Sequence, residues 1–82
     1  MNDQKIRQVL SAHGKLSGDA HTMASSDDLY EAGMTSHASV NVMLGIEDAF
    51  DLEFPDEMLR RTTFQSIDAI SAAVESLLQQ SA

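Results

Sequence analysis

Apolar side chains recur at three- and four-residue intervals in separate stretches of the chain, and this spacing predicts amphipathic helices. The first helix is expected from Asp3 to about Leu16, with Asn2 or Asp3 as its N-cap. Gly14 and Gly18 bracket its end, and Lys15 and Leu16 add at most a ragged last turn. Its apolar stripe is narrow, which favours an outer helix, and consists of Ile6, Val9, Leu10 and His13.

The second stretch, Ser36 to Asp51, separates into two faces at about 100° per residue. The face expected to form the core contains Ser39, Val42, Met43, Ile46, Ala49 and Phe50. On the other face, Val40 and Leu44 lie one turn apart among polar neighbours, so both are expected to be exposed. We predict that this face binds partner proteins through Thr35, His37, Val40, Asn41, Leu44, Glu47 and Asp48. The alternative is that two isolated apolar side chains on a surface have no function.

The C-terminal part predicts two further helices. Pro55 suits the first position of a short third helix that places Met58 and Leu59 inward and ends at Arg60–Arg61. A capping box of Thr62 and Gln65 predicts a fourth helix from about Thr63 to Gln79. Its stripe is clear and consists of Ile67, Ile70, Ala73, Val74, Leu77 and Leu78.

Residues 17–35 show no regular spacing of apolar side chains and are rich in Gly, Ser, Asp, Thr and His. This composition predicts a long ordered loop. Met23 and the pair Leu29–Tyr30 are expected to anchor this loop to the core, and Asp27–Asp28 to cap a single turn. The predicted fold is therefore all-α. It is a four-helix bundle with three longer helices, a short third helix and a long first loop, in a single domain over residues 1–82.

The charge balance narrows the class of partner. The 82 residues include 13 Asp and Glu against 5 Lys and Arg, a formal net charge of −8. This balance argues against nucleic-acid binding and favours a partner with a basic surface, although acidity can also serve solubility alone. The chain has no cysteine, which excludes disulfides and thiolate metal sites. With neither a secretory segment nor an apolar run of membrane-spanning length, we expect a soluble, cytoplasmic monomer that does not bind membranes.

Ser36 is the residue most suited to chemistry, because it lies where a glycine-containing loop meets the second predicted helix. The N–H groups of a first helical turn and the positive end of the helix dipole stabilise a phosphate there. The alternative is an ordinary N-cap serine.

Metal binding and catalysis are not expected. His13, His21 and His37 follow no compact ligand spacing. His37 adjoins Ser36, but neighbouring helical side chains point about 100° apart, and no buried acid is predicted to orient the imidazole. We therefore predict that the chain is not an enzyme.

Three segments together resemble the acyl carrier protein family. They are Asp28–Ser36, then Val40, and then Ile46 through Pro55–Asp56. In that family the matching serine carries 4′-phosphopantetheine through a phosphodiester, and the thiol of this arm holds an acyl cargo as a thioester. The resemblance thus implies that Ser36 is modified by a phosphopantetheinyl transferase, and that the cofactor supplies the thiol. It also implies an enzyme that loads the cargo and a downstream acyl-transfer enzyme.

Departures from the family pattern bear on the cargo and the partners. Thr35-Ser36-His37 replaces the usual acid-serine-leucine, Ala38 and Asn41 stand where the exposed face is often acidic, and Arg60–Arg61 ends the third helix. Such changes alter partner choice and favour a specialised carrier. The residues around Ser36 also resemble bacterial stand-alone carriers that receive an activated amino acid from an amino acid:[carrier protein] ligase. A peptidyl or specialised acyl carrier would use the same residues.

Two alternatives stay open at this point. The chain could be a helical interaction domain that has kept the carrier fold without the modification, or, less in keeping with the sequence, an enzyme with Ser36 as nucleophile. Met43 and Ile46, facing Met58 and Leu59, either line a cleft for an apolar cargo or simply form the core.

Overall fold

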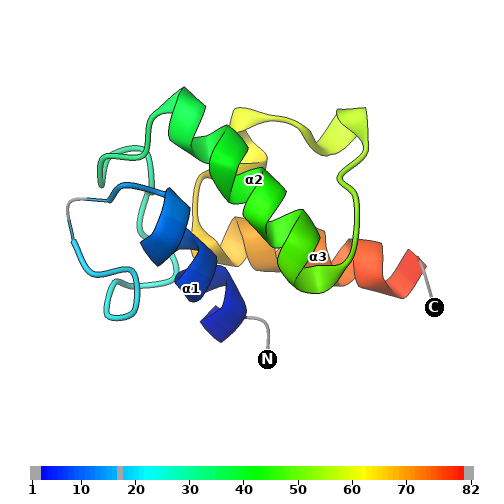
Figure 1. Cartoon of the computed structure of the whole chain (residues 1–82), viewed down its shortest axis with the longest axis horizontal. Helices are drawn as coiled ribbons and strands as arrows, with labels where there is room; N and C mark the ends of the chain where they lie inside the picture. Colours follow the sequence, from blue (N-terminus) through cyan, green and yellow to red (C-terminus); the bar gives the residue numbers. More distant parts are fainter. Residues whose placement is uncertain (1–2, 17, 81–82) are drawn as a thin grey trace.

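The computed structural model describes residues 3–16 and 18–80, and this part of the chain is helical with no strand (Figure 1). Three α-helices are joined by loops and two 3-10 turns: α1 (Asp3–His13), α2 (Ser36–Phe50), η1 (Asp56–Met58), η2 (Arg61–Phe64) and α3 (Ile67–Gln80). The predicted all-α class is confirmed. Asn2, one of the two caps proposed for the first helix, and Ser17, where the loop was expected to begin, lie outside the described residues.

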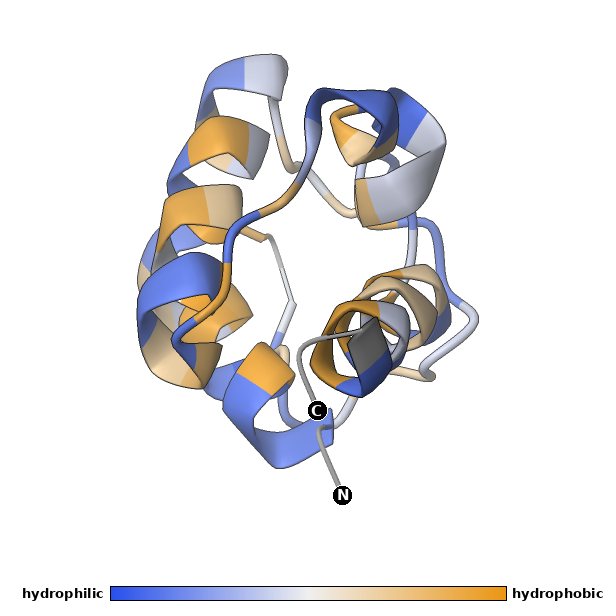
Figure 2. Cartoon of the chain, turned by 90° about the vertical axis from the view of Figure 1, so that its right-hand side faces the viewer, coloured by the Kyte–Doolittle hydropathy of each residue, from blue (hydrophilic) through white to orange (hydrophobic). Residues whose placement is uncertain are grey.

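The helices enclose one apolar core. Helix α1 packs against α2 and α3, and η2 packs against α3. Figure 2 shows hydrophobic residues, in orange, recurring along each helix between hydrophilic ones in blue. The largest fully buried side chains come from all three helices and the first loop: Ile6, Leu10, Leu29, Val42, Ile46, Ile67, Ile70 and Val74. The stripes predicted for the first and last helices are confirmed at these positions, whereas His13 is exposed and Leu78 is 37% exposed.

Helix α1 ends earlier than predicted. The N–H of Gly14 still donates to the carbonyl of Leu10 over 2.8 Å, but Lys15 adopts a left-handed conformation with φ of 53°. A non-glycine residue with positive φ cannot continue a right-handed helix. The ragged last turn through Leu16 is therefore not formed.

The buried face of α2 is rotated from the predicted one. Its buried residues are Ala38, Val42 and Ile46, so Ala38, expected on the exposed face, belongs to the core. Ser39 and Phe50 are only half-buried. Phe50 lies at the edge of the core, where the Lys5 ammonium sits 5.2 Å from the centroid of its ring. The remaining residues of the predicted core face, Met43 and Ala49, are also half-buried.

The predicted short third helix is replaced by the two 3-10 turns. In η1 the N–H groups of Met58 and Leu59 donate to the carbonyls three residues earlier, Pro55 and Asp56, at 2.9 and 3.1 Å. Arg60 then takes an extended conformation, with φ of −122° and ψ of 154°, and this breaks the segment before η2. Pro55 occupies the N-cap position instead of the first helical position, and Leu59, expected to face inward, is 45% exposed.

Helix α3 begins later than predicted because Ser66, and not Thr62, caps it. The Ser66 hydroxyl accepts from the N–H of Ala69 over 3.1 Å. The predicted capping box is wrong, since Thr62 lies within η2, Gln65 is the C-cap of η2, and the Gln65 amide donates to the Asp28 carboxylate over 3.3 Å. Phe64 of the same turn packs edge-on against Phe54, with 5.3 Å between ring centroids.

Hydrogen bonds tie residues 18–35 of the first loop to α1 and to the residues that precede α3. The Arg7 guanidinium donates to the carbonyls of Ala20 and Met23 at 2.9 and 2.7 Å. The N–H of Leu29 donates to the carbonyl of Gln65 over 2.7 Å, and Leu29 is fully buried. These contacts fix the end of the loop, from which the chain enters α2.

Candidate functional site

A single helical turn delivers the chain to Ser36. The Asp28 carboxylate caps this turn by accepting from the N–H groups of Tyr30 and Glu31 at 2.9 and 3.3 Å, as predicted. Gly33, with φ of 115°, ends it. The N–H of Gly33 donates to Tyr30 and that of Met34 to Leu29, at 3.1 and 3.0 Å, which is the hydrogen-bond pattern of a glycine-terminated helix end. Met34 is then buried, so the entry into α2 is fixed on both sides.

Thr35 is the N-cap of α2, and Ser36 is its first helical residue. The Thr35 hydroxyl accepts from the N–H of Ala38 over 3.0 Å, and its carbonyl accepts from the N–H of Ser39 over 2.9 Å. The alternative in which Ser36 serves as an ordinary cap is therefore wrong. Thr35, predicted to bind partners, has its hydroxyl engaged within the chain.

Several polar groups at the start of α2 are available to a ligand. The Ser36 side chain is exposed and, within the described part of the chain, makes no hydrogen bond. The backbone N–H groups of Ser36 and His37 likewise have no acceptor among the described residues. A phosphate ester on Ser36 would lie next to these donors and to the positive end of the helix dipole.

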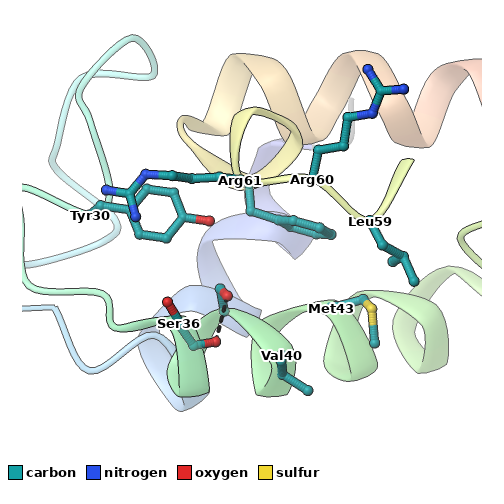
Figure 3. A pocket seen from close by; sticks show the side chains of 9 residues that line it. Tyr30, Ser36, Val40, Met43, Leu59, Arg60 and Arg61 are labelled. Atoms are coloured by element: carbon teal, nitrogen blue, oxygen red, sulfur yellow. Dashed lines mark hydrogen bonds between the residues drawn. The ribbon is translucent and has the colours of Figure 1, made fainter. Parts of the chain in front are cut away.

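Ser36 lies at the edge of a pocket of about 360 Å³ between α2 and the segment 59–64 (Figure 3). The residues lining the pocket come from the single turn, α2 and the 3-10 segment: Tyr30, Ser36, Ser39, Val40, Met43, Leu59, Arg60, Arg61 and Phe64. Ser39 is tied down, because its hydroxyl donates to the carbonyl of Ser36 over 2.7 Å. Ser36 thus presents the free hydroxyl of the pocket on its α2 side.

A cation stacked on an aromatic ring forms part of the pocket wall. The Arg61 guanidinium carbon lies 3.9 Å from the centroid of the Tyr30 ring. The sequence pattern predicts Tyr30 as a core anchor and Arg61 as a helix-terminal residue, and it does not predict their pairing. The signal available in the sequence was the presence of two adjacent arginines in a strongly acidic chain.

The cleft suggested by the sequence exists only in part. Met43 and Leu59 line the pocket, but Ile46 is fully buried in the core, and Met58 packs against the core without lining the pocket. Core packing is therefore confirmed for Ile46 and Met58, while a cleft for an apolar cargo at Met43 and Leu59 stays a prediction.

The predicted partner-binding face of α2 is largely accessible. Val40 and Leu44 are 50% and 52% exposed, as the pattern predicted. His37 and Asp48 are exposed, and Asn41 is half-buried. This face adjoins the pocket through Val40, which belongs to both. A protein that covers it would therefore also meet Ser36.

Glu47 differs from the rest of this face. One of its carboxylate oxygens accepts from the N–H of Phe54 over 2.8 Å, and the N–H of Leu52 donates to the Glu47 carbonyl over 3.0 Å. Asp51, with a φ of 54°, makes the sharp turn that lies between Glu47 and Phe54 in the chain. Glu47, predicted to bind partners, therefore fastens the chain that leaves α2.

Residues 3–16 and 18–80 contain neither a metal-binding cluster nor a membrane-spanning helix. No group of three or more His, Cys, Asp or Glu side chains is arranged to hold a metal ion in that part of the chain. None of its helices has both the length and the apolar character needed to cross a membrane.

The chain is similar in sequence to known carriers. A family model described as "Phosphopantetheine attachment site" matches residues 4–74. An aminoacyl carrier protein of Agrobacterium fabrum is 51% identical over 73 residues, which cover 89% of this chain and 88% of the relative.

Two solved structures of carrier proteins with a ligase are similar to the chain. One is a carrier protein from Agrobacterium tumefaciens complexed with an engineered Bradyrhizobium japonicum glycine:[carrier protein] ligase and ATP. It matches with a TM-score of 0.89 and 47% identity over 93% of this chain and 99% of the other. The second is a structure of Bradyrhizobium japonicum glycine:[carrier protein] ligase complexed with glycylated carrier protein. It matches with a TM-score of 0.74 and 26% identity over 88% of this chain and 96% of the other.

Proposed function

The chain belongs to the phosphopantetheine attachment site family, and from this premise we propose that Ser36 is the residue to which 4′-phosphopantetheine is attached. Family membership confirms the resemblance to acyl carrier proteins and makes the chain a carrier that holds its cargo on this prosthetic group. The alternative of an unmodified interaction domain is not favoured. The matched region contains several hydroxyl side chains, so the choice of residue needs a local argument.

One observation supports Ser36 over its neighbours. The hydroxyls of Thr35 and Ser39 are engaged with the backbone of α2, at 3.0 and 2.7 Å, whereas that of Ser36 is exposed and makes no hydrogen bond within the described residues. The N–H groups of Ser36 and His37 fit a phosphodiester at this position. The residues at the start of α2 therefore fit a 4′-phosphopantetheine group attached to Ser36.

Each part of the chain has a distinct role in this function. The prosthetic group, when bound, supplies the thiol that holds the cargo as a thioester, which the chain itself lacks because it has no cysteine. Thr35 and the turn ended by Gly33 hold Ser36 at the surface. Val40 and Leu44 present an apolar contact beside it for the enzymes that modify and load the carrier. The chain contributes no catalytic group of its own in this scheme.

An amino acid is the cargo that the similarities support best. The Agrobacterium fabrum relative is an aminoacyl carrier protein, and one similar structure contains a glycylated carrier protein with its ligase. We accordingly propose an amino acid:[carrier protein] ligase as the loading partner. A phosphopantetheinyl transferase and a downstream acyl-transfer enzyme complete the set of partners. The monomeric state, the cytoplasmic location, the single-domain organisation and the absence of metal, membrane and nucleic-acid binding stay predictions.

Loading of the prosthetic arm tests this proposal. The phosphopantetheinylated chain, an amino acid:[carrier protein] ligase, ATP and one labelled amino acid at a time are incubated together, and label released by hydroxylamine is measured as thioester. We expect labelling of the modified wild type, and none of the unmodified chain or of Ser36→Ala. Labelling of Ser36→Ala would refute the attachment site. If no amino acid loads while an acyl-chain ligase labels the same protein, the aminoacyl cargo is wrong.

A further inference from the structure

The pocket beside Ser36 has two chemically different ends. Figure 3 shows Ser36, Tyr30 and Arg61 together at one end, and Met43 and Leu59 at the other. The end nearest Ser36 therefore carries the positive charge of Arg61 and the phenol of Tyr30, whereas Met43 and Leu59 give the other end apolar side chains. Whatever is attached to Ser36 meets the cationic end first.

The Arg61 side chain is held in place while its hydrogen-bond donors stay free. Its guanidinium carbon lies over the Tyr30 ring, 3.9 Å from the centroid, a contact that uses none of its N–H groups as hydrogen-bond donors to an oxygen. Among the described residues it makes no hydrogen bond or ion pair. A guanidinium has five N–H donors in its plane, in a geometry that matches the oxygens of a phosphate. Stacking lowers the entropy that Arg61 would lose on binding an anion.

The acidic character of the chain makes a contact between Arg61 and a phosphate on Ser36 favourable. The chain carries a formal net charge of −8, so a further negative charge at Ser36 is added to an acidic protein. Arg61 and Arg60 are two of its 5 Lys and Arg residues, and both line this pocket. In Figure 3 the Arg60 guanidinium points away from Ser36, whereas that of Arg61 lies on the Tyr30 ring at the Ser36 end.

From these observations we infer that Arg61, held by Tyr30, binds the phosphodiester attached to Ser36 and restrains the first part of the prosthetic arm against the pocket. This inference rests on the proposed attachment at Ser36. It assigns to Arg61 a positioning role at the base of the arm.

Nuclear magnetic resonance of the intact chain tests the contact without any measure of loading. Uniformly ¹⁵N-labelled protein is prepared with and without the arm, and its mass is measured first to establish attachment. We expect the Arg61 Nε–H resonance and the Tyr30 ring resonances to shift when the arm is present. Unchanged Arg61 and Tyr30 resonances in a fully modified sample would overturn the inference and leave the attachment at Ser36 intact. Failure to gain the arm would instead refute the proposed function, and the inference with it.

The ³¹P resonance of the phosphodiester provides the matched comparison. Arg61→Gln and Arg60→Gln remove the same charge from adjacent exposed residues of one pocket, so their general electrostatic effects are similar. We expect Arg61→Gln to shift the ³¹P resonance and Arg60→Gln to leave it close to the wild-type position. Equal shifts in the two variants, or none in either, would show that Arg61 makes no specific contact. The wild-type Nε–H measurement decides the question if Arg61→Gln fails to fold.

Discussion

The hydroxyl of Thr35 accepts a hydrogen bond from the backbone N–H of Ala38 over 3.0 Å, so the cap of α2 and the residue proposed to carry the prosthetic group are neighbours with separate roles. Because the cap is made by Thr35, modification of Ser36 costs the helix no capping bond. The phosphodiester would instead be added to a helix start that is already formed.

Removal of this cap should lower stability without removing the attachment residue. We expect Thr35→Ala to decrease the free energy of unfolding by about 1 kcal/mol, because the N–H of Ala38 loses its acceptor. Thr35→Ser keeps a hydroxyl and should lose much less. Urea denaturation followed by circular dichroism measures both variants, and equal stability of Thr35→Ala and the wild type would contradict the assigned cap.

A close approach of α1 to α2 makes Gly45 sensitive to any side chain. A Cβ at Gly45 would lie 2.8 Å from Cγ1 of Val9 and 3.0 Å from Cδ2 of His13. Val9 is buried and β-branched, so it cannot easily move away. We expect Gly45→Ala to destabilise the chain by about 1–3 kcal/mol despite the better helix propensity of alanine.

Gly18 offers the matched control for Gly45. A Cβ there meets no atom within 4 Å, so Gly18→Ala should leave the thermal midpoint unchanged or raise it slightly. The packing argument would fail if both glycine variants unfolded at the same temperature.

The carboxylate of Glu47 should matter for stability more than its position on an exposed face suggests. Glu47→Ala leaves the N–H of Phe54 without its acceptor and should cost about 1–2 kcal/mol of unfolding free energy. Asp48, its exposed neighbour, makes no such side-chain contact among the described residues, and Asp48→Ala should change stability by less than about 0.5 kcal/mol. Equal effects of the two substitutions in guanidinium denaturation would count against this role.

Partner binding should depend on the apolar contact of α2. Leu44 is 52% exposed, so Leu44→Asp removes little core packing but places a charge where a ligase would bury an apolar side chain. We expect the dissociation constant for an amino acid:[carrier protein] ligase to rise at least about tenfold, with little change in stability. Titration calorimetry measures this, with Ala72→Asp on exposed α3 surface as the control. Equal weakening by both variants would place the interface elsewhere.

The sequence predicts the parts of the fold that depend on periodicity. Most side chains of the α1 and α3 stripes are buried where predicted, His13 and Leu78 excepted, because a sustained spacing of three and four residues determines one face of a helix. The residues around Ser36 also identify the start of α2 correctly. Their hydroxyls do not distinguish the cap from the first helical residue, since Thr35 and Ser36 are both good N-caps.

The segment 55–66 could not be predicted in the same way. It contains two good helix starts, Pro55 and Thr62, yet tertiary contacts decide its structure, since Leu29 and Asp28 hold Gln65 by hydrogen bonds. The pocket depends on this segment, because its 3-10 turns bring Arg61 over Tyr30. Thirty residues of the sequence lie between Tyr30 and Arg61, and no local sequence pattern predicts such a contact.

Intact-mass measurement tests the central claim most directly. The chain, Ser36→Ala and Ser39→Ala are each produced with a broad-specificity phosphopantetheinyl transferase. Ser39 is the neighbouring serine of the same pocket, and its hydroxyl is held by the carbonyl of Ser36. We predict that the wild type and Ser39→Ala gain the mass of one phosphopantetheine and that Ser36→Ala gains none. An unmodified wild type, or a Ser36→Ala protein that still gains this mass, would contradict the assignment of Ser36 as the attachment site.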